Sequence, residues 1–208
     1  MKKQFLLASA FSILAFVANS QIKKGSTFLG GTISASVSKT DQPVGPDLKN
    51  NSFVFSPAIG KAVRDNFIVG GELSFQSGKN ENNFYDTEQT GFGAGVFIRQ
   101  YKTLGKGFYL FGQGKLGGFY RNHEVDNKTS PMASYEQKDF GVEANFYPGI
   151  SYAVTNKLHI EAVFNNLAYI QYSTSKTEDA TGTESTTNGF SIGTSLSNFG
   201  DLGVGVRF

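Results

Sequence analysis

Apolar and polar residues alternate along most of this chain, and this period of two restricts the fold more than any other feature of the sequence. In the run 158–165, Leu158 and Ile160 share one parity, whereas His159 and Glu161 share the other. Successive side chains of a β-strand point to opposite faces, so such a run predicts a strand with one apolar and one polar face. No segment after residue 20 keeps a helical period over three turns. Eight runs follow the pattern, at residues 29–38, 53–60, 67–76, 92–101, 108–119, 140–151, 158–165 and 190–208.

The connections between these runs alternate in length. The short ones cover residues 64–66, 102–107 and 153–157. The long ones are polar and rich in Asn, Thr, Asp, Glu and Lys; they cover residues 39–51, 77–89, 121–138 and 170–187. Short turns at one end and long loops at the other are typical of an antiparallel up-and-down barrel, with both termini at the end of the short turns.

Alternation alone also fits a soluble barrel or sandwich, which would bury the apolar face. Three further features favour a barrel in a membrane. The polar face is rich in Gly, Ser and Asn and lacks the dense Lys and Glu of a solvent-facing sheet, and the apolar face carries almost no charge at mid-strand. Aromatic residues also gather at strand ends, where girdles would mark the membrane interfaces: Tyr101, Phe108, Tyr109 and Tyr152 at the turn side, and Tyr120, Tyr135, Tyr169 and Tyr172 at the loop side. The sequence therefore predicts an all-β fold, an eight-stranded antiparallel up-and-down transmembrane β-barrel.

The N-terminus has the pattern of a secretory signal peptide. Met1-Lys2-Lys3 precedes an apolar stretch at 5–17, and small residues precede Gln21. The apolar stretch of about 13 residues is shorter than the about 20 that a membrane-spanning helix needs. We expect residues 1–20 to be removed on export and residues 21–208 to form one barrel in the cell outer membrane.

Composition excludes several classes of function. Without Lys2 and Lys3, 17 of the 19 basic residues remain against 17 acidic ones, so residues 21–208 have a net charge near zero and no basic excess for nucleic acid. The chain has no cysteine, which excludes a lipid-modified N-terminal Cys, a disulfide framework and thiolate metal sites.

Four short segments carry a family pattern. They are the junction Ser20-Gln21, the segment Ser56-Pro57-Ala58-Ile59-Gly60 before the turn Arg64-Asp65-Asn66, the segment Gly95-Val96-Phe97-Ile98-Arg99-Gln100-Tyr101, and the terminal Gly203-Val204-Gly205-Val206-Arg207-Phe208. In these the chain resembles the small outer-membrane β-barrel family of Bacteroidetes, the OmpA-like or "porin family" barrels. The resemblance implies an eight-stranded barrel inserted by the outer-membrane barrel-assembly machinery, which reads a C-terminal aromatic such as Phe208. The peptidoglycan-binding domain of OmpA itself is not expected, because the chain ends at the last predicted strand.

Charged residues on the polar parity should point into the lumen. They could line an ion pathway. We instead expect them to pair and to plug a narrow barrel, because an unpaired buried charge costs several kcal/mol. Strand order places Arg99 within reach of Glu72 or the fifth strand, and Lys115 within reach of Glu143. The predicted lumen residues are Glu72, Arg99, Lys115, Glu143, His159, Glu161, Asp201 and Arg207.

Two motifs hint at catalysis without supporting it. The G-x-G-x-x-G pattern at 112–117 lies inside a strand run, whereas a dinucleotide site needs a helix to follow it. His159 and Glu161 could act as base and carboxylate, but no adjacent nucleophile and no third metal ligand can be named. We therefore predict no catalytic, cofactor-binding or metal-binding residue.

Three functions remain. The favoured one is a non-enzymatic envelope component whose four outer loops serve surface interaction. The second is a small pore or transporter for ions or small solutes, and the third is an outer-membrane lipid or peptide hydrolase. The expected partners are the lipid bilayer, the barrel-assembly machinery and a surface ligand that the sequence does not name; no nucleic acid and no cofactor are expected.

Overall fold

Strands make up almost the whole structure. The computed structural model describes residues 22–40, 48–164, 167–194 and 199–207. No helix in this part of the chain is long and apolar enough to cross a membrane. The elements are β1 (Thr27–Thr40), β2 (Leu48–Arg64), β3 (Phe67–Glu81), β4 (Tyr85–Gly105), β5 (Phe108–Asn127), the 3-10 turn η2 (Pro131–Ala133), β6 (Tyr135–Ala153), β7 (Leu158–Phe164), β8 (Ala168–Asp179), β9 (Glu184–Thr194) and β10 (Phe199–Arg207).

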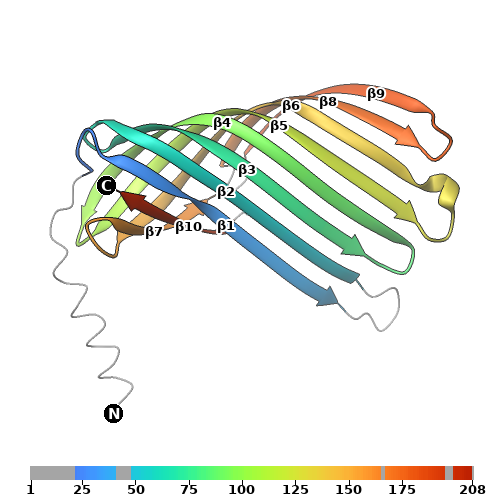
Figure 1. Cartoon of the computed structure of the whole chain (residues 1–208), viewed down its shortest axis with the longest axis horizontal. Coiled ribbons are helices and arrows are strands. Elements are labelled where there is room, and N and C mark those ends of the chain that lie inside the picture. The colour runs from blue at the N-terminus through green and yellow to red at the C-terminus, as the bar shows by residue number, and fades with distance from the viewer. Residues whose placement is uncertain (1–21, 41–47, 165–166, 195–198, 208) are drawn as a thin grey trace, which may run out of the picture.

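Every strand pair is antiparallel, and the pairs follow the chain from β1 to β6 (Figure 1). At the end of the short turns β6 pairs with β7, β7 with β10 and β10 with β1, which completes a ring of eight strands. The predicted class, all-β with antiparallel up-and-down strands, is confirmed. The strand count differs for two reasons: β8 lies mostly in the predicted connection 170–187, and the last predicted strand, 190–208, is divided between β9 and β10.

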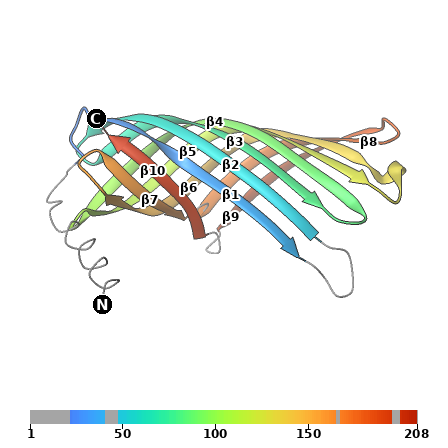
Figure 2. The ribbon, with the colours of Figure 1, turned by 60° about the horizontal axis from the view of Figure 1, so that its bottom comes forward.

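The ring does not continue to the other end of the sheet. Strand β1 pairs with β10 only over Phe28–Ile33. Among the described residues, the remainder of β1 pairs with β2 alone, and β9 pairs with β8 alone. Figures 1 and 2 show the hairpins spreading at this end. The predicted closed barrel is therefore closed only in its turn-side half, because strands must lie about 4.8 Å apart to pair and β1 and β9 diverge.

The two faces of the sheet separate apolar from polar side chains, as the alternation predicts. Outward-facing Ile59, Val96 and Leu116 are about 60% exposed in the protein alone. On the same strands Arg99 and Gln113 face inward and are buried. A sheet with apolar residues outside and polar residues inside suits lipid around it and a polar lumen within it.

An aromatic row marks the outer limit of the apolar surface. Phe75 pairs with Phe92, Phe92 with Tyr120, and Tyr120 with Phe140, across four adjacent strands. Beyond this row the outward-facing residues turn polar, as at Glu88 on β4. The row has the position of an interfacial girdle.

The girdle prediction was wrong for four tyrosines. Tyr101 and Tyr109 point into the lumen and are only 2% and 1% exposed. Tyr135 and Tyr169 also have the inward parity of their strands. Adjacent residues of a strand face opposite sides, so of the pair Phe108-Tyr109 only Phe108 can face lipid.

Three of the four long connections are largely strand rather than loop. Strands β3 and β4 are separated by residues 82–84, β5 and β6 by residues 128–134, and β8 and β9 by residues 180–183. These segments are polar on both faces, so the alternation of apolar and polar residues did not predict strands there. Backbone pairing nevertheless continues through them. The fourth connection includes residues 41–47, which lie outside the described residues. Paired hairpins are stiffer than loops, so this end of the molecule presents an extended sheet.

The short turn between β2 and β3 forms hydrogen bonds with Ile22, the first described residue. Asn66 has a positive φ of 59°, which Asn tolerates better than most residues. Its backbone N–H donates to Ile22 O at 2.8 Å, and its side-chain Oδ1 accepts from Ile22 N at 3.3 Å. Ile22 is thereby held at the turn-side end of the barrel, where it is only 3% exposed.

Candidate functional site

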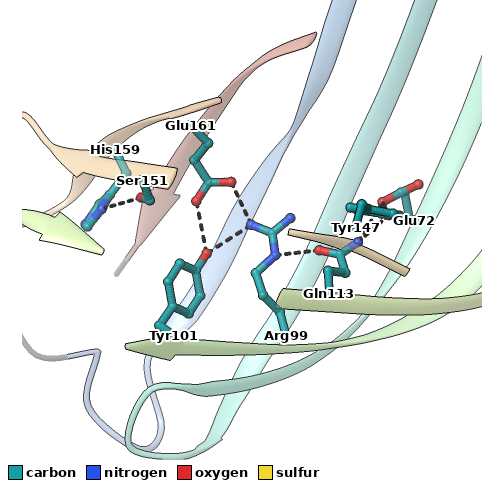
Figure 3. A network of polar contacts seen from close by, with 8 residues as sticks. All are labelled: Glu72, Arg99, Tyr101, Gln113, Tyr147, Ser151, His159 and Glu161. Carbon is teal, nitrogen blue, oxygen red and sulfur yellow. Dashed lines mark hydrogen bonds and ion pairs between the residues drawn. The ribbon is translucent and has the colours of Figure 1, made fainter. Parts of the chain in front are cut away.

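Arg99 is the centre of a polar network that fills the lumen near the turn end (Figure 3). Its Nη1 donates to Glu161 Oε2 at 2.6 Å and to Tyr101 Oη at 2.9 Å, and its Nε donates to Gln113 Oε1. Tyr101 Oη donates in turn to Glu161 Oε1 at 2.9 Å. Residues of β4, β5 and β7 thus meet across the lumen, and both oxygens of Glu161 accept hydrogen bonds. Bonds between ionised groups are stronger than neutral ones, so this cluster ties the strands together.

Aromatic rings surround the same guanidinium. Arg99 Cζ lies 4.6 Å from the ring centre of Phe111 and 4.9 Å from that of Phe28, both within cation–π range. The surrounding layer consists of the almost fully buried side chains of Ile22, Phe28, Ile68, Phe97, Tyr101, Tyr109 and Phe111. Together with the Arg99–Glu161 pair, this layer closes the lumen on the side of the short turns.

A second cluster lies around Lys115. Lys115 Nζ is 2.8 Å from Glu72 Oε1 and 4.0 Å from Glu143 Oε1. Gln113 Nε2 donates to Glu72 Oε2 at 3.3 Å and to Tyr147 Oη at 2.5 Å, which links this cluster to Arg99.

The network is balanced in charge. Arg121 Nη2 lies 3.6 Å from Glu143 Oε2 and adds a third basic group. Three cations, from Arg99, Lys115 and Arg121, therefore face three carboxylates, from Glu72, Glu143 and Glu161. Among the described side chains, such an arrangement stabilises the charges by pairing and leaves no excess of one sign to attract an ion.

A cavity of about 210 Å³ lies in the lumen beside this network. Its lining includes Arg99, Lys115, Glu72 and Glu143, together with small polar residues such as Ser74. Other lining residues, such as Gln76, Gly91 and Arg121, lie on the hairpin side of Arg99, so the Arg99 network forms the floor of a cup whose cavity faces the long hairpins.

His159 makes a contact that the sequence did not predict. Its Nδ1 lies 3.2 Å from Ser151 Oγ, and both residues have an exposure of 0% (Figure 3). A serine nucleophile needs its hydroxyl open to a substrate, and in serine hydrolases the base accepts through Nε2 while Nδ1 is held by the acid. The pair has neither feature, and its environment is that of a packed core.

The structure describes six of the eight predicted lumen residues, and all six point inward. Arg99 reaches Gln113 on the fifth strand, but its ion pair is with Glu161 across the lumen rather than with Glu72. Lys115 lies closer to Glu72 than to Glu143. The other two of the eight, Asp201 and Arg207, lie outside the described side chains. So does Phe208, the predicted assembly signal.

The sequence-based prediction missed the neutral members of the network and also Arg121, which it placed in the connection 121–138. Tyr101, Gln113 and Tyr147 share the inward parity of the charged residues, and that parity was the available signal. Within the predicted strands the prediction took only the ionisable residues of that parity, although a buried ion pair requires neutral donors and acceptors around it.

Charged side chains on the hairpins form exposed pairs. Hydrogen bonds from Lys79 to Glu88 and Glu81 raise the pKa of Lys79. At the end of β8, hydrogen bonds from the Thr181 side chain and the Thr183 backbone lower the pKa of Asp179. Exposed pairs contribute little stability, so these contacts chiefly orient side chains.

Metal ligation is not supported where side chains are described. There, no three His, Asp or Glu side chains are grouped so as to hold an ion.

Comparison with known proteins gives one family and several distant folds. A family model described as "Outer membrane protein beta-barrel domain" matches residues 4–208. No curated protein matches the sequence. Ail, the attachment invasion locus protein of Yersinia pestis, is similar at 13% identity and a TM-score of 0.46, over 89% of this chain and 99% of that one. A major outer membrane protein from Thermus thermophilus has 8% identity and a TM-score of 0.47, over 88% and 99%. The translocator domain of autotransporter NalP from Neisseria meningitidis has 12% identity and a TM-score of 0.41, over 100% and 95%.

Proposed function

Because the chain belongs to the outer membrane protein beta-barrel domain family, we propose that it is a non-enzymatic, non-conducting component of the outer membrane. In this proposal the turn end faces the periplasm, and the long hairpins stand outside the cell as a surface for interaction. The protein would reach this place by export with residues 1–20 as a signal peptide and by insertion through the barrel-assembly machinery.

The observation that carries the proposal is the asymmetry of the lumen. Its turn-side end is filled by the buried Arg99–Glu161 pair and the aromatic layer, whereas its other half contains a cavity and continues into the hairpins β3–β4, β5–β6 and β8–β9. A pore needs a polar path from one side to the other. A cup with a closed floor offers binding surface on one side only.

The described serine and histidine that lie together, which the hydrolase alternative would use, are not accessible to a substrate. Ser151 and His159 are fully buried. Glu161 is hydrogen-bonded to Arg99 and Tyr101, which suits a structural ion pair better than an acid–base role.

Single-channel recording in a planar bilayer tests the proposal. The mature protein, refolded in detergent and inserted from one side, should produce no stepwise current, whereas a porin inserted from the same detergent should. Insertion is checked separately by protease protection of the bilayer-embedded protein. Stepwise current from inserted wild-type protein would contradict the closed floor and favour the pore.

A further inference from the structure

The projecting hairpins carry a pocket that is separate from the charged network. It lies on the inward face of β4, β5 and β6, beyond the aromatic row, and has a volume of about 430 Å³. We name it the tyrosine pocket and define it by its lining residues, Tyr85, Thr87, His123, Val125, Tyr135 and Gln137. Its volume falls within the roughly 300–1,000 Å³ that is usual for small-molecule sites.

Two tyrosines form opposite sides of this pocket. Tyr85 is 43% exposed and Tyr135 is 40% exposed, so both rings are open to a ligand. They lie on β4 and β6, on either side of β5, and their partners on β5, Asn127 and Val125, are two residues apart. With a strand spacing of about 4.8 Å and a rise of about 3.4 Å per residue, their backbones are about 12 Å apart. Val125 pairs with both Thr87 and Tyr135, so its side chain forms the middle of the pocket between β4 and β6.

The polar atoms of the pocket are oriented in advance. Asp139 Oδ1 accepts a hydrogen bond from Gln137 Nε2 at 2.9 Å, and Asp139 Oδ2 lies 3.7 Å from His123 Nε2. The Asp139 carboxylate thus fixes the Gln137 side chain by a hydrogen bond and lies beside the His123 ring. Sites whose side chains are fixed by a second set of contacts bind with less loss of entropy.

The hairpin tips around the pocket are joined to each other. Asn82 Oδ1 accepts from the backbone N–H of Tyr85 at 2.8 Å, which fixes the start of β4. Lys128, just beyond β5, donates to Asn82 O at 2.8 Å and lies 2.7 Å from Asp86. The β3–β4 and β5–β6 hairpins therefore present the tyrosine pocket on a stiff support.

From these contacts we infer that the tyrosine pocket binds an uncharged oligosaccharide. Aromatic faces stack on the C–H faces of sugar rings, and tyrosine combines such a face with a hydroxyl that can bond to sugar hydroxyls. The Gln, His and Thr side chains supply further donors and acceptors. Among the lining residues none is Asp, Glu, Lys or Arg, which disfavours phosphate groups and charged polymers as ligands. This inference rests on the proposed function, since it requires the hairpins to face the outside of the cell.

Binding of defined hexasaccharides to the full mature chain tests the inference. The probes are maltohexaose, chitohexaose and mannohexaose, and the protein is kept in a detergent without a sugar headgroup so that the detergent does not compete. At least one probe should bind with a Kd of about 1 mM or tighter, measured by calorimetry or saturation-transfer NMR. Tyr135→Ala and Tyr85→Ala should each weaken that binding at least about tenfold, as removal of an aromatic contact at the centre of a site does.

Tyr172→Ala is the matched control, because Tyr172 is 50% exposed but lies on the outer face of β8. It should leave binding unchanged, and heat-modifiability gels should show all three variants folded. Absence of binding by all three probes, or equal binding by all variants, would overturn the inference. Capture of peptides from a casein digest at the same tyrosines, without any effect of sugars, would overturn it in favour of a peptide site. Cysteine labelling of the hairpins, described below, tests the orientation separately, so failure of the two proposals can be told apart.

Discussion

The guanidinium of Arg99 lies in a part of the lumen where an unpartnered charge would be unstable. It is only 5% exposed, and its partners are the ionised Glu161 and the neutral Tyr101 and Gln113. Removing one member of a buried pair leaves the other without compensation, which costs more than the pair gained by forming. Arg99 is therefore the residue at which a single substitution should affect the barrel most.

We expect Arg99→Ala to destabilise the folded barrel by about 3–5 kcal/mol. The measurement is the unfolding temperature on a heat-modifiability gel, supported by urea unfolding in the same detergent. Arg64→Ala is the control, because Arg64 is exposed and its contact with the Phe67 ring is worth at most about 1 kcal/mol.

A double substitution separates charge from packing at the same position. Arg99→Met with Glu161→Leu removes both charges while keeping volume, so it should be less destabilising than Arg99→Ala. Equal unfolding temperatures for Arg99→Ala and Arg64→Ala would mean that Arg99 is solvated in an open lumen, contrary to the closed floor.

At the scale of elements, the conformation of the β8–β9 turn depends on hydrogen bonds to Asp179, the last residue of β8. Asp179 accepts hydrogen bonds from Thr181 Oγ1 at 2.6 Å, from Thr181 N at 2.9 Å and from Thr183 N at 2.9 Å. These bonds favour the carboxylate and hold the pKa of Asp179 below its ordinary value. A group with a lowered pKa stabilises the folded form above its ordinary pKa and loses this effect as the pH falls through the lowered value.

The amide signals of Thr181 and Thr183 should therefore shift together in acid, with a midpoint below the ordinary pKa of aspartate. NMR of the protein in micelles measures this titration. Asp179→Asn keeps an acceptor oxygen but cannot titrate, so it should abolish the transition. A midpoint above the ordinary value would show that these bonds do not favour the carboxylate.

The same hairpin reports the orientation of the whole sheet. Thr181 lies in the β8–β9 turn, and Asn156 lies in the short turn between β6 and β7, at the opposite end. Thr181→Cys should react with a membrane-impermeant maleimide on intact cells, and Asn156→Cys should react only after the outer membrane is opened. The chain has no native cysteine to interfere. The reverse pattern would place the short turns outside and would refute the proposed function.

For the whole molecule, the aromatic row predicts the depth of the barrel in the bilayer. Ala94 and Glu88 both face outward on β4, on opposite sides of Phe92 in the row. A spin label at Ala94→Cys should be more accessible to oxygen, which concentrates in lipid, and one at Glu88→Cys to a water-soluble nickel chelate. Equal accessibility to the nickel chelate at both positions would show that the apolar face is not embedded where the row indicates.

The alternation of apolar and polar residues predicted which side chains point into the lumen. The inward parity of Arg99, Lys115 and Glu161 could be read from alternation, because it depends only on the geometry of the strand itself. The partner of Arg99 could not, since Glu161 is 62 residues away and meets it across the lumen. The inward direction of Tyr101 was also available from parity, but the tendency of tyrosine to mark membrane interfaces took precedence over it.

Sequence by itself determined the all-β class, the two faces of the strands and the inward direction of the six described residues that were predicted to line the lumen. These follow from a side-chain period of two and need no long-range information. Only the tertiary structure decided where the ring of strands ends, how Arg99 and Glu161 close the floor, and that polar segments read as loops continue as paired hairpins around a tyrosine pocket. These features depend on which strands and side chains meet across the barrel, and such distances are set by packing and register rather than by neighbours in the chain.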